Sequence, residues 1–326
     1  MKNEKDSKKI LIAAGGTGGH IFPAIVMGRN FEKEGAQVQW LCGARQLEQE
    51  IYKAQGVSPF TLSIEGSPLG TSSIKKNFGR CLSLIKSFFE TFSFIKSFKP
   101  DEIFLFGGYI SFAPLIVAKL KKIPVTLHEQ NAIAGKVTRF ALRLGAKIIT
   151  GWPECEGLEK KDFEYTGIPV REPVRLERED ALKTLGLDLE AGAKIICISG
   201  GSLVSGPLNS LLTKTAELCR DFEFVFISHE KKDSGNVHFI LPQWNMNPFY
   251  SIADVLVCRA GGSTLAEVLS WGIPAVSIPW PEAADNHQTK NAAEFVKLSR
   301  NKSRAFDEND TPENLARVIG DLILKK

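Results

Sequence analysis

The sequence has 326 residues, of which 43% are hydrophobic and 24% are charged. This length predicts two folded domains, because a single domain usually holds about 150 residues. The composition excludes a disordered chain. The net charge of +4 suits contact with acidic ligands or anionic lipid, but it is too small to indicate a protein that binds nucleic acid.

The cysteines and the apolar runs narrow the class of protein further. The six cysteines form no C-x-x-C pair and have no histidine at the spacing of a zinc site, so we expect reduced thiols in a cytosolic protein. Residues 1–9 are hydrophilic, and no later run reaches 18 uncharged apolar residues. We therefore expect neither a signal peptide nor a membrane-spanning segment.

Short apolar runs alternate with helical patterns along the chain, which is typical of parallel α/β units. We expect strands of a first sheet over 10–14, 37–41, 102–106, 124–127 and 147–150. Strands of a second sheet are expected over 194–199, 223–227, 255–258 and 275–278. Residues 151–192, rich in Pro, Glu and Arg, predict an interdomain linker and the start of the second domain, with the boundary near Gly167. This order predicts two doubly wound domains that face each other across a ligand-binding cleft.

The first glycine-rich turn, in "LIAAGGTGGHIFPA" at residues 11–24, joins a predicted strand to a helix. Such a turn lets backbone amides approach an anion. It does not match the dinucleotide-binding pattern, because the third glycine would fall at Ile21 and the second strand ends in "CGAR" without an acidic residue. A P-loop is excluded because no G-K-[ST] follows. A simple tight turn remains the alternative.

His20 stands where this helix begins. An imidazole at the mouth of a cleft suits a general base that takes a proton from a bound hydroxyl. The alternative is a residue of the first helical turn that makes only a local hydrogen bond. From this residue alone, the local role is favoured.

A second glycine-rich turn, in "CRAGGSTLAE" at residues 258–267, predicts a helix with Glu267 in its first turn. Its amides, with Ser263 and Thr264, suit a diphosphate, and its carboxylate suits the two hydroxyls of a ribose. The alternative is a capping arrangement between Ser263 and Glu267. The segment "DNHQTKNA" at 285–292 then supplies uncharged polar groups suited to sugar hydroxyls.

We expect no metal ion at the diphosphate, because the sequence has no D-x-D triplet. The nearest approximation, residues 188–190, lies in a charged segment before a predicted strand. Helix N-termini, backbone amides and Arg171 would then stabilise the leaving phosphate.

The motifs indicate a protein family only when they are taken together in their order along the chain. In chain order the sequence contains "GGTGGHIFPA", "GGYISFAPLIVA", "IPVTLHEQNAIAGKVTR", "GIPVR", "ISGGS", "CRAGGSTLAE" and "DNHQTKNA". This set resembles the MurG family of N-acetylglucosaminyltransferases over nearly the whole chain. The resemblance implies the GT-B fold, with residues 1–167 as the acceptor-binding, membrane-facing domain and residues 168–326 as the donor-binding domain.

The resemblance also implies a reaction. The C4 hydroxyl of the N-acetylmuramoyl-pentapeptide of undecaprenyl-linked lipid I attacks UDP-N-acetylglucosamine with inversion, giving lipid II for peptidoglycan synthesis. No cofactor is implied. The implied location is peripheral, at the cytoplasmic face of the bacterial inner membrane, with an anionic membrane surface and other cell-wall and division enzymes as partners.

Site residues follow from the same resemblance. His20 is the preferred catalytic base, and Glu129 in "HEQN" is its competitor. Tyr109 and His128 are implied to line the acceptor cleft, with a buried pair that supports the loop as the alternative. The residues implied to bind the donor are Thr17, Gly18, Gly19, Asn131, Arg171, Ser202, Gly262, Ser263, Thr264, Leu265, Ala266, Glu267 and Gln288.

Residues 74–98, "IKKNFGRCLSLIKSFFETFSFIKSF", carry an apolar stripe near helical spacing together with five basic residues. Such a helix suits an anionic membrane surface. The alternative is that the stripe packs on the first sheet, which we expect for its inner positions. The stripe comprises Ile74, Phe78, Leu82, Ile85, Phe89 and Phe92.

The sequence departs from the family pattern in three places. Leu-Val-Ser follows "GGS" at 203–205 instead of Gln-Gly-Ala, and "EGSPLGTSS" at 65–73 replaces a Gly-x-Arg-Gly loop. The sequence also ends at Lys326, where family members carry a further helix, so we expect looser domain closure. Two alternatives stay open: a catalytically weak nucleotide-sugar-binding scaffold for cell-wall enzymes, and a GT-B transferase that acts on another lipid.

Overall fold

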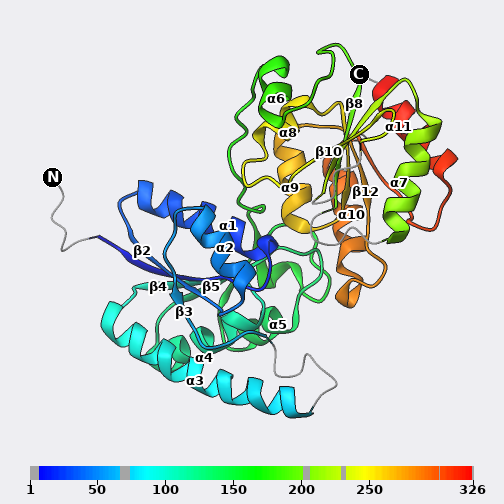
Figure 1. Cartoon of the computed structure of the whole chain (residues 1–326). Coiled ribbons are helices and arrows are strands. Elements are labelled where there is room, and N and C mark those ends of the chain that lie inside the picture. The colour runs from blue at the N-terminus through cyan, green and yellow to red at the C-terminus, as the bar shows by residue number, and fades with distance from the viewer. Residues whose placement is uncertain (1–6, 67–73, 201–205, 229–232, 301, 325–326) are drawn as a thin grey trace. The chain divides into compact units, whose positions relative to one another are not determined.

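A computed structural model describes residues 7–66, 74–200, 206–228, 233–300 and 302–324 (Figure 1). The chain divides into two compact units, residues 1–170 and 171–326. The division at Val170 lies close to the boundary expected near Gly167. Each unit is a parallel α/β fold built around one sheet.

Unit 1 contains a seven-stranded sheet in the order β3-β2-β1-β4-β5-β6-β7, in which every described pairing is parallel. The chain starts in the middle of the sheet and builds outward on both sides, as doubly wound folds do. The strands are β1 (Lys9–Ala13), β2 (Gln37–Cys42), β3 (Phe60–Thr61), β4 (Glu102–Leu105), β5 (Val125–Glu129), β6 (Lys147–Thr150) and β7 (Phe163–Tyr165).

Helices cover both faces of this sheet, and alternate residues of β1 show why. Ile10 and Ile12 pack against α1 (Gly18–Lys33) and α2 (Gln46–Ala54). Leu11 and Ala13 belong to the core on the other face. That second face is covered by α3 (Ile74–Phe98), α4 (Phe112–Lys121) and α5 (Lys136–Arg143). Strands buried on both faces explain why the sequence shows continuous apolar runs.

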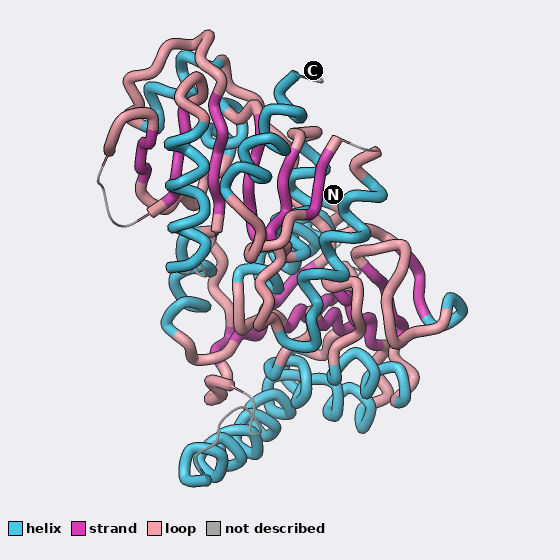
Figure 2. The backbone as a smooth tube through the Cα atoms, turned by 90° about the vertical axis from the view of Figure 1, so that its right-hand side faces the viewer, coloured by secondary structure: helices cyan, strands magenta, loops and turns pink. Residues whose placement is uncertain are grey.

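Unit 2 repeats the plan with a six-stranded parallel sheet in the order β10-β9-β8-β11-β12-β13. Figure 2 shows its strands between helices. The strands are β8 (Ile195–Ser199), β9 (Glu223–Ile227), β10 (Val237–Ile240), β11 (Val255–Arg259), β12 (Ala275–Ile278) and β13 (Ser303–Ala305). The helices are α6 (Arg178–Leu185), α7 (Gly206–Leu218), α8 (Asn247–Ile252), α9 (Gly262–Trp271), α10 (His287–Leu298) and α11 (Pro312–Leu324).

The nine predicted strands are confirmed to within two residues at either end, and three match in full: β6, β9 and β12. The structure adds β3, β7, β10 and β13, which lie at or next to the sheet edges and hold two to four residues each. The interpretation of residues 151–192 as a linker is wrong in part. Residues 163–165 form β7, which pairs with β6 and extends the first sheet.

Candidate active site

In each unit the strand order reverses between the first strand and its neighbour, which is where open α/β sheets bind ligands. In unit 1 this point lies between β1 and β4, and the turn at 14–17 and the turn at 106–108 follow these strands. In unit 2 it lies between β8 and β11, and the turn at 260–261 follows β11. The glycine-rich turns of the sequence therefore stand at the expected ligand positions.

Glu48 organises the glycine-rich turn of unit 1. Its carboxylate is fully buried, and it accepts hydrogen bonds from the amide of Gly16 at 2.9 Å and the amide of Gly43 at 2.7 Å. A Cβ on Gly15 would lie 2.6 Å from the Glu48 carboxylate, so a side chain there would displace the carboxylate from its hydrogen bonds. Gly16 also has a φ of 90°, which disfavours any side chain. Sequence reasoning missed Glu48.

Tyr109 completes this arrangement from the turn that follows β4. Its hydroxyl donates to Oε1 of Glu48, and its ring lies 5.1 Å below the guanidinium of Arg45. Burial and the neighbouring carboxylate raise the pKa of Tyr109 far above its usual value, so the hydroxyl stays protonated as a donor. The contacts of Tyr109 therefore connect the turn at 106–108 to the glycine-rich turn.

His20 lies in the first turn of α1 and is partly exposed. Its Nδ1 lies 3.1 Å from the carbonyl oxygen of Gly15. A carbonyl can only accept, so Nδ1 carries the proton and, in the neutral ring, Nε2 carries the lone pair. This contact is the local hydrogen bond that the alternative for His20 predicted. It also selects the tautomer that a general base requires.

Glu129, the competing base, ends β5 and is buried. Its Oε1 accepts from the amide and the side chain of Asn131 at 3.0 and 3.2 Å. Its Oε2 accepts from the amide of Gly135 at 3.0 Å and the hydroxyl of Thr138 at 2.5 Å. A carboxylate offers about four lone-pair sites. Glu129 therefore fixes the loop that carries Asn131 through four hydrogen bonds.

His128 is fully buried and stacks on Phe106 with ring centroids 5.5 Å apart. Its Nε2 donates to the carbonyl of Gly167 at 2.8 Å, and its Nδ1 accepts from the side-chain amide of Gln130 at 3.1 Å. Burial lowers the pKa of His128 to about 4. The side chain of His128 has no exposed surface. Tyr109 bonds to Glu48 and not to His128, so the hydrogen-bonded pair of the alternative is not formed, and the acceptor-cleft role of His128 stays a prediction.

The glycine-rich turn of unit 2 leads into α9, whose N-cap is Gly261 and whose first residues are Gly262, Ser263 and Thr264. No side chain caps this fully described helix, and its first turn holds no acidic residue. The capping alternative for Ser263 is therefore wrong, because Ser263 lies inside the helix. Glu267 lies in the second turn, not the first as expected. The helix N-terminus carries partial positive charge and suits an anion.

Glu267 sits in a polar cluster with Arg171 and Tyr250. Its Oε1 pairs with Nη2 of Arg171 at 3.0 Å, and its Oε2 accepts from the hydroxyl of Tyr250 at 2.9 Å. Arg171 also donates to the carbonyl of Trp244 at 2.7 Å. Burial and the neighbouring carboxylate raise the pKa of Tyr250 well above its usual value, so the hydroxyl remains a donor. The structure thus places Arg171 against Glu267, both within unit 2.

Gln288 and Asn291, one turn apart on α10, hold the backbone of the same glycine-rich turn. Oε1 of Gln288 accepts from the amides of Ala260 at 3.2 Å and Trp280 at 2.9 Å. The side-chain amide of Asn291 donates to the carbonyl of Ala260 at 3.1 Å. Both side chains are buried. Gln288 therefore fixes the backbone of the turn through hydrogen bonds. Asn291 does the same, and the sequence analysis did not identify it.

The remaining residues predicted to bind the donor differ in how far they are exposed to a ligand. The side chain of Leu265 is fully buried in the core, so only its backbone is able to meet a ligand. Thr17, at the N-cap of α1, is exposed, and Gly18, Gly19 and Ala266 are partly exposed. Ser202 and the departure at 203–205 lie outside the described residues.

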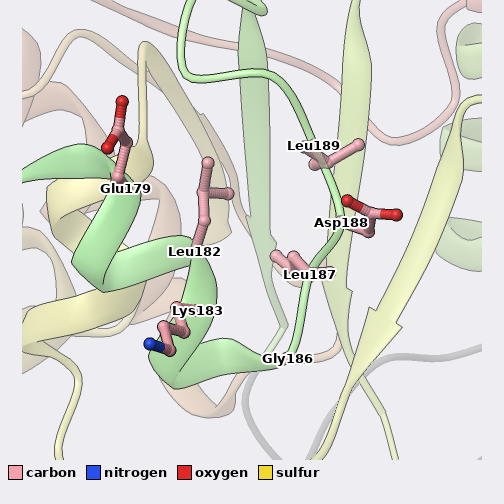
Figure 3. A pocket seen from close by; sticks show the side chains of 7 residues that line it. All are labelled: Glu179, Leu182, Lys183, Gly186, Leu187, Asp188 and Leu189. Atoms are coloured by element: carbon pink, nitrogen blue, oxygen red, sulfur yellow. The ribbon is translucent and has the colours of Figure 1, made fainter.

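Figure 3 shows a pocket in unit 2, lined by residues of α6 and of the loop that follows it. Its lining residues span only 179–189, and none is a predicted site residue. Among the residues that the structure describes, no group of three or more His, Cys, Asp or Glu side chains gathers as a metal site would require. No described helix is long and apolar enough to cross a membrane.

Comparisons with known proteins agree with this geometry. The model of the glycosyltransferase family 28 N-terminal domain matches residues 10–150, and that of the family 28 C-terminal domain matches residues 195–326. The two sheets and their glycine-rich turns thus define a glycosyltransferase of the GT-B fold. The crystal structure of Acinetobacter baumannii MurG is similar with a TM-score of 0.72 at 26% identity, over 97% of this chain and 91% of that one.

Curated relatives narrow the class. A protein of Pseudomonas fluorescens is 34% identical over 87% of this chain and 81% of its own length. One from Protochlamydia amoebophila is 28% identical over 97% of this chain and 88% of its own. Both are named UDP-N-acetylglucosamine--N-acetylmuramyl-(pentapeptide) pyrophosphoryl-undecaprenol N-acetylglucosamine transferase. The chain belongs to this family, the MurG family.

Proposed function

We propose that this chain transfers N-acetylglucosamine from UDP-N-acetylglucosamine to the C4 hydroxyl of the N-acetylmuramoyl-pentapeptide of lipid I, giving lipid II. The relatives are named as transferases of N-acetylglucosamine that act on UDP-N-acetylglucosamine and N-acetylmuramyl-(pentapeptide) pyrophosphoryl-undecaprenol. The observation that carries the proposal within the chain is the hydrogen bond from Nδ1 of His20 to Gly15, because it leaves the lone pair on Nε2 for the proton of an attacking hydroxyl.

In the proposed reaction Nε2 of His20 takes the proton of the C4 hydroxyl while the oxygen bonds to the anomeric carbon of the donor. The bond from this carbon to the diphosphate breaks with inversion, and UDP leaves with the electron pair. The imidazolium then returns its proton to solvent. Glu129 is the less suitable base, because four hydrogen bonds already occupy its carboxylate.

Unit 2 is proposed to hold the donor. The N-terminus of α9 would meet the diphosphate through the amides of Gly262, Ser263 and Thr264, without a metal ion. Glu267 would accept hydrogen bonds from the hydroxyls of the ribose, and these hydrogen bonds would replace its ion pair with Arg171. The released guanidinium is then able to turn toward the diphosphate and offset the charge of the leaving group.

Binding at an anionic membrane surface is the second part of the proposal. On α3 the side chains of Phe89, Ile85 and Leu82 are 65%, 56% and 53% exposed, at spacings of three and four residues that place them on one face. Lys86 is exposed on the same helix. Phe92 is only partly buried but packs against the core. The three exposed side chains form the surface that we propose meets the bilayer, and the side chains of residues 74–78 lie outside the described part.

The test is an assay with purified protein, radiolabelled UDP-N-acetylglucosamine and a lipid I analogue, with chelator present. We expect a labelled lipid-linked disaccharide. Donor binding without any product on a lipid acceptor would support the scaffold alternative instead. Transfer to diacylglycerol but not to the lipid I analogue would support the alternative of another lipid acceptor.

A further inference from the structure

Two arginines from separate elements converge at Gly66 in unit 1. Arg45 is the N-cap residue of α2, and its Nε donates to the carbonyl of Glu65 at 2.5 Å. Arg80 comes from α3. A Cβ built on Gly66 would lie 3.2 Å from Nη2 of Arg45 and 3.4 Å from Nη2 of Arg80. The two guanidinium groups therefore lie against the same point of the backbone.

This convergence points to an anion. Guanidinium groups present planar forks of donors that match the oxygens of a phosphate, so a pair suits a diphosphate in particular. Arg45 is exposed and Arg80 is partly exposed, so both are accessible to a ligand from solution.

The position of the pair within unit 1 narrows the choice of anion. The guanidinium of Arg45 lies over the ring of Tyr109, and Cε1 of that ring lies 3.6 Å from the Cβ position of Gly16. Arg45 is thereby joined through Tyr109 to the glycine-rich turn that carries His20. Arg80 lies on α3, the helix that also carries the exposed side chains of Leu82, Ile85 and Phe89, but a spacing of two residues turns Arg80 to a different face from Leu82.

We propose that Arg45 and Arg80 bind the diphosphate of the lipid-linked acceptor. Such an acceptor consists of an apolar chain, then a diphosphate, then the sugar that reacts. Unit 1 presents groups suited to each part: the exposed apolar face of α3, the two arginines at Gly66, and His20 in the glycine-rich turn to which Arg45 is joined through Tyr109. The proposal rests on the proposed function, since it names residues for the acceptor of that reaction.

The first test measures binding and needs no transfer. Farnesyl diphosphate and farnesol are titrated against the full chain, against Arg45→Gln/Arg80→Gln, and against Arg29→Gln, an exposed arginine of α1 that serves as the matched control. We expect farnesyl diphosphate to bind the double variant about 10-fold more weakly or worse, with farnesol and the control variant unaffected. Equal binding of farnesyl diphosphate to all three proteins would overturn the proposal.

The second test uses the transfer reaction. The KM for a detergent-solubilised lipid I analogue should rise about 10-fold in the double variant while the KM for UDP-N-acetylglucosamine stays unchanged. Arg45→Lys/Arg80→Lys should recover part of this loss, because it restores the charge without the fork. If the wild-type chain transfers nothing, the proposed function fails, but the farnesyl diphosphate titration still decides the role of the arginines.

Phospholipid headgroups are the other source of the same phosphate chemistry. Flotation with phosphatidylglycerol vesicles, run on the wild type and the double variant, separates the two sources. We expect at most a small change in vesicle binding. A large loss of vesicle binding with unchanged affinity for farnesyl diphosphate would assign the pair to the bilayer surface and overturn the proposal.

Discussion

Nδ1 of His20 donates a hydrogen bond to the carbonyl oxygen of Gly15 over 3.1 Å, and this contact decides which ring nitrogen is able to accept a proton. His128 has the opposite arrangement, with the proton on Nε2 and the lone pair on Nδ1 turned to Gln130. The first ring is partly exposed and the second is buried. The two histidines of unit 1 near the glycine-rich turn thus differ in tautomer and in exposure, and only His20 is proposed as the general base.

The buried His128 should make stability depend on pH. Its pKa is about 4 in the folded chain, against about 6.5 for an exposed histidine. Between these values the unfolded chain binds more protons, so the free energy of unfolding should fall as pH drops from 6.5 to 4, by up to about 3 kcal/mol. Urea unfolding at pH 7 and pH 5 measures this loss.

A control isolates His128 from the other titrating groups. His128→Gln retains a donor for the carbonyl of Gly167 but does not titrate, so its unfolding should depend less on pH over the same range. His238→Gln removes the partner of Glu223 in unit 2 and should leave the dependence due to His128 intact. An identical pH dependence in wild type and His128→Gln would contradict this assignment.

Glu48→Gln should destabilise unit 1 and reduce transfer. The amide side chain has one acceptor oxygen, and its NH₂ group would face the amide donors of Gly16 or Gly43. We expect a loss of about 2 kcal/mol or more in the free energy of unfolding, measured by urea titration. Glu50→Gln on the same helix removes only an exposed contact to Gln46 and should change stability by less than about 0.5 kcal/mol. Equal stability of both variants would show that the Glu48 contacts contribute little.

Glu267→Gln should weaken donor binding and leave the chemical step nearly unchanged. The variant keeps one oxygen that accepts a hydrogen bond from Tyr250. It loses the negative charge that pairs with Arg171, and it loses the second oxygen that we propose accepts from the ribose. We expect the Kd for UDP-N-acetylglucosamine, measured by calorimetry, to rise about 10-fold. The exposed Glu282→Gln is the matched control. A normal donor Kd with a reduced kcat would mean that Glu267 acts in chemistry instead.

The exposed face of α3 should determine membrane binding. Replacing Ile85 and Phe89 with Ser removes two apolar side chains that would otherwise enter the bilayer, so flotation with anionic vesicles should fall about 10-fold or more. Leu218→Ser, at an exposed position on α7 in unit 2, should leave flotation unchanged. Phe92→Ser should lower thermal stability, because its ring packs on the core. Unchanged flotation of the double variant would contradict a role of this face in membrane binding.

The central strands and the glycine-rich turns could be predicted because their residues carry local signals: apolar runs for buried parallel strands, and glycine where a turn must open. The short edge strands could not. Phe163–Tyr165 follows the charged run at 159–162 and itself contains Glu164, and it forms a strand by pairing with β6. Pairing of this kind depends on distant residues that local pattern does not reveal.

The site shows the same limit. His20 and Glu267 are predictable because they belong to motifs, whereas Glu48 lies in an ordinary helical sequence and contacts Gly16, 32 positions away in the chain. Ser263 resembled a cap by spacing, but the helix begins one residue earlier. Asn291 supports the turn of unit 2 through Ala260, 31 positions away in the sequence.

The most direct test of His20 is a single-turnover measurement of transfer to a lipid I analogue at saturating donor, for wild type, His20→Ala and Glu129→Gln. A general base contributes about 100-fold to 10,000-fold to a rate. We expect a loss in that range for His20→Ala with the donor Kd unchanged. Glu129→Gln should lose activity only in proportion to its loss of folded protein. A wild-type single-turnover rate in His20→Ala would contradict the assignment of the base.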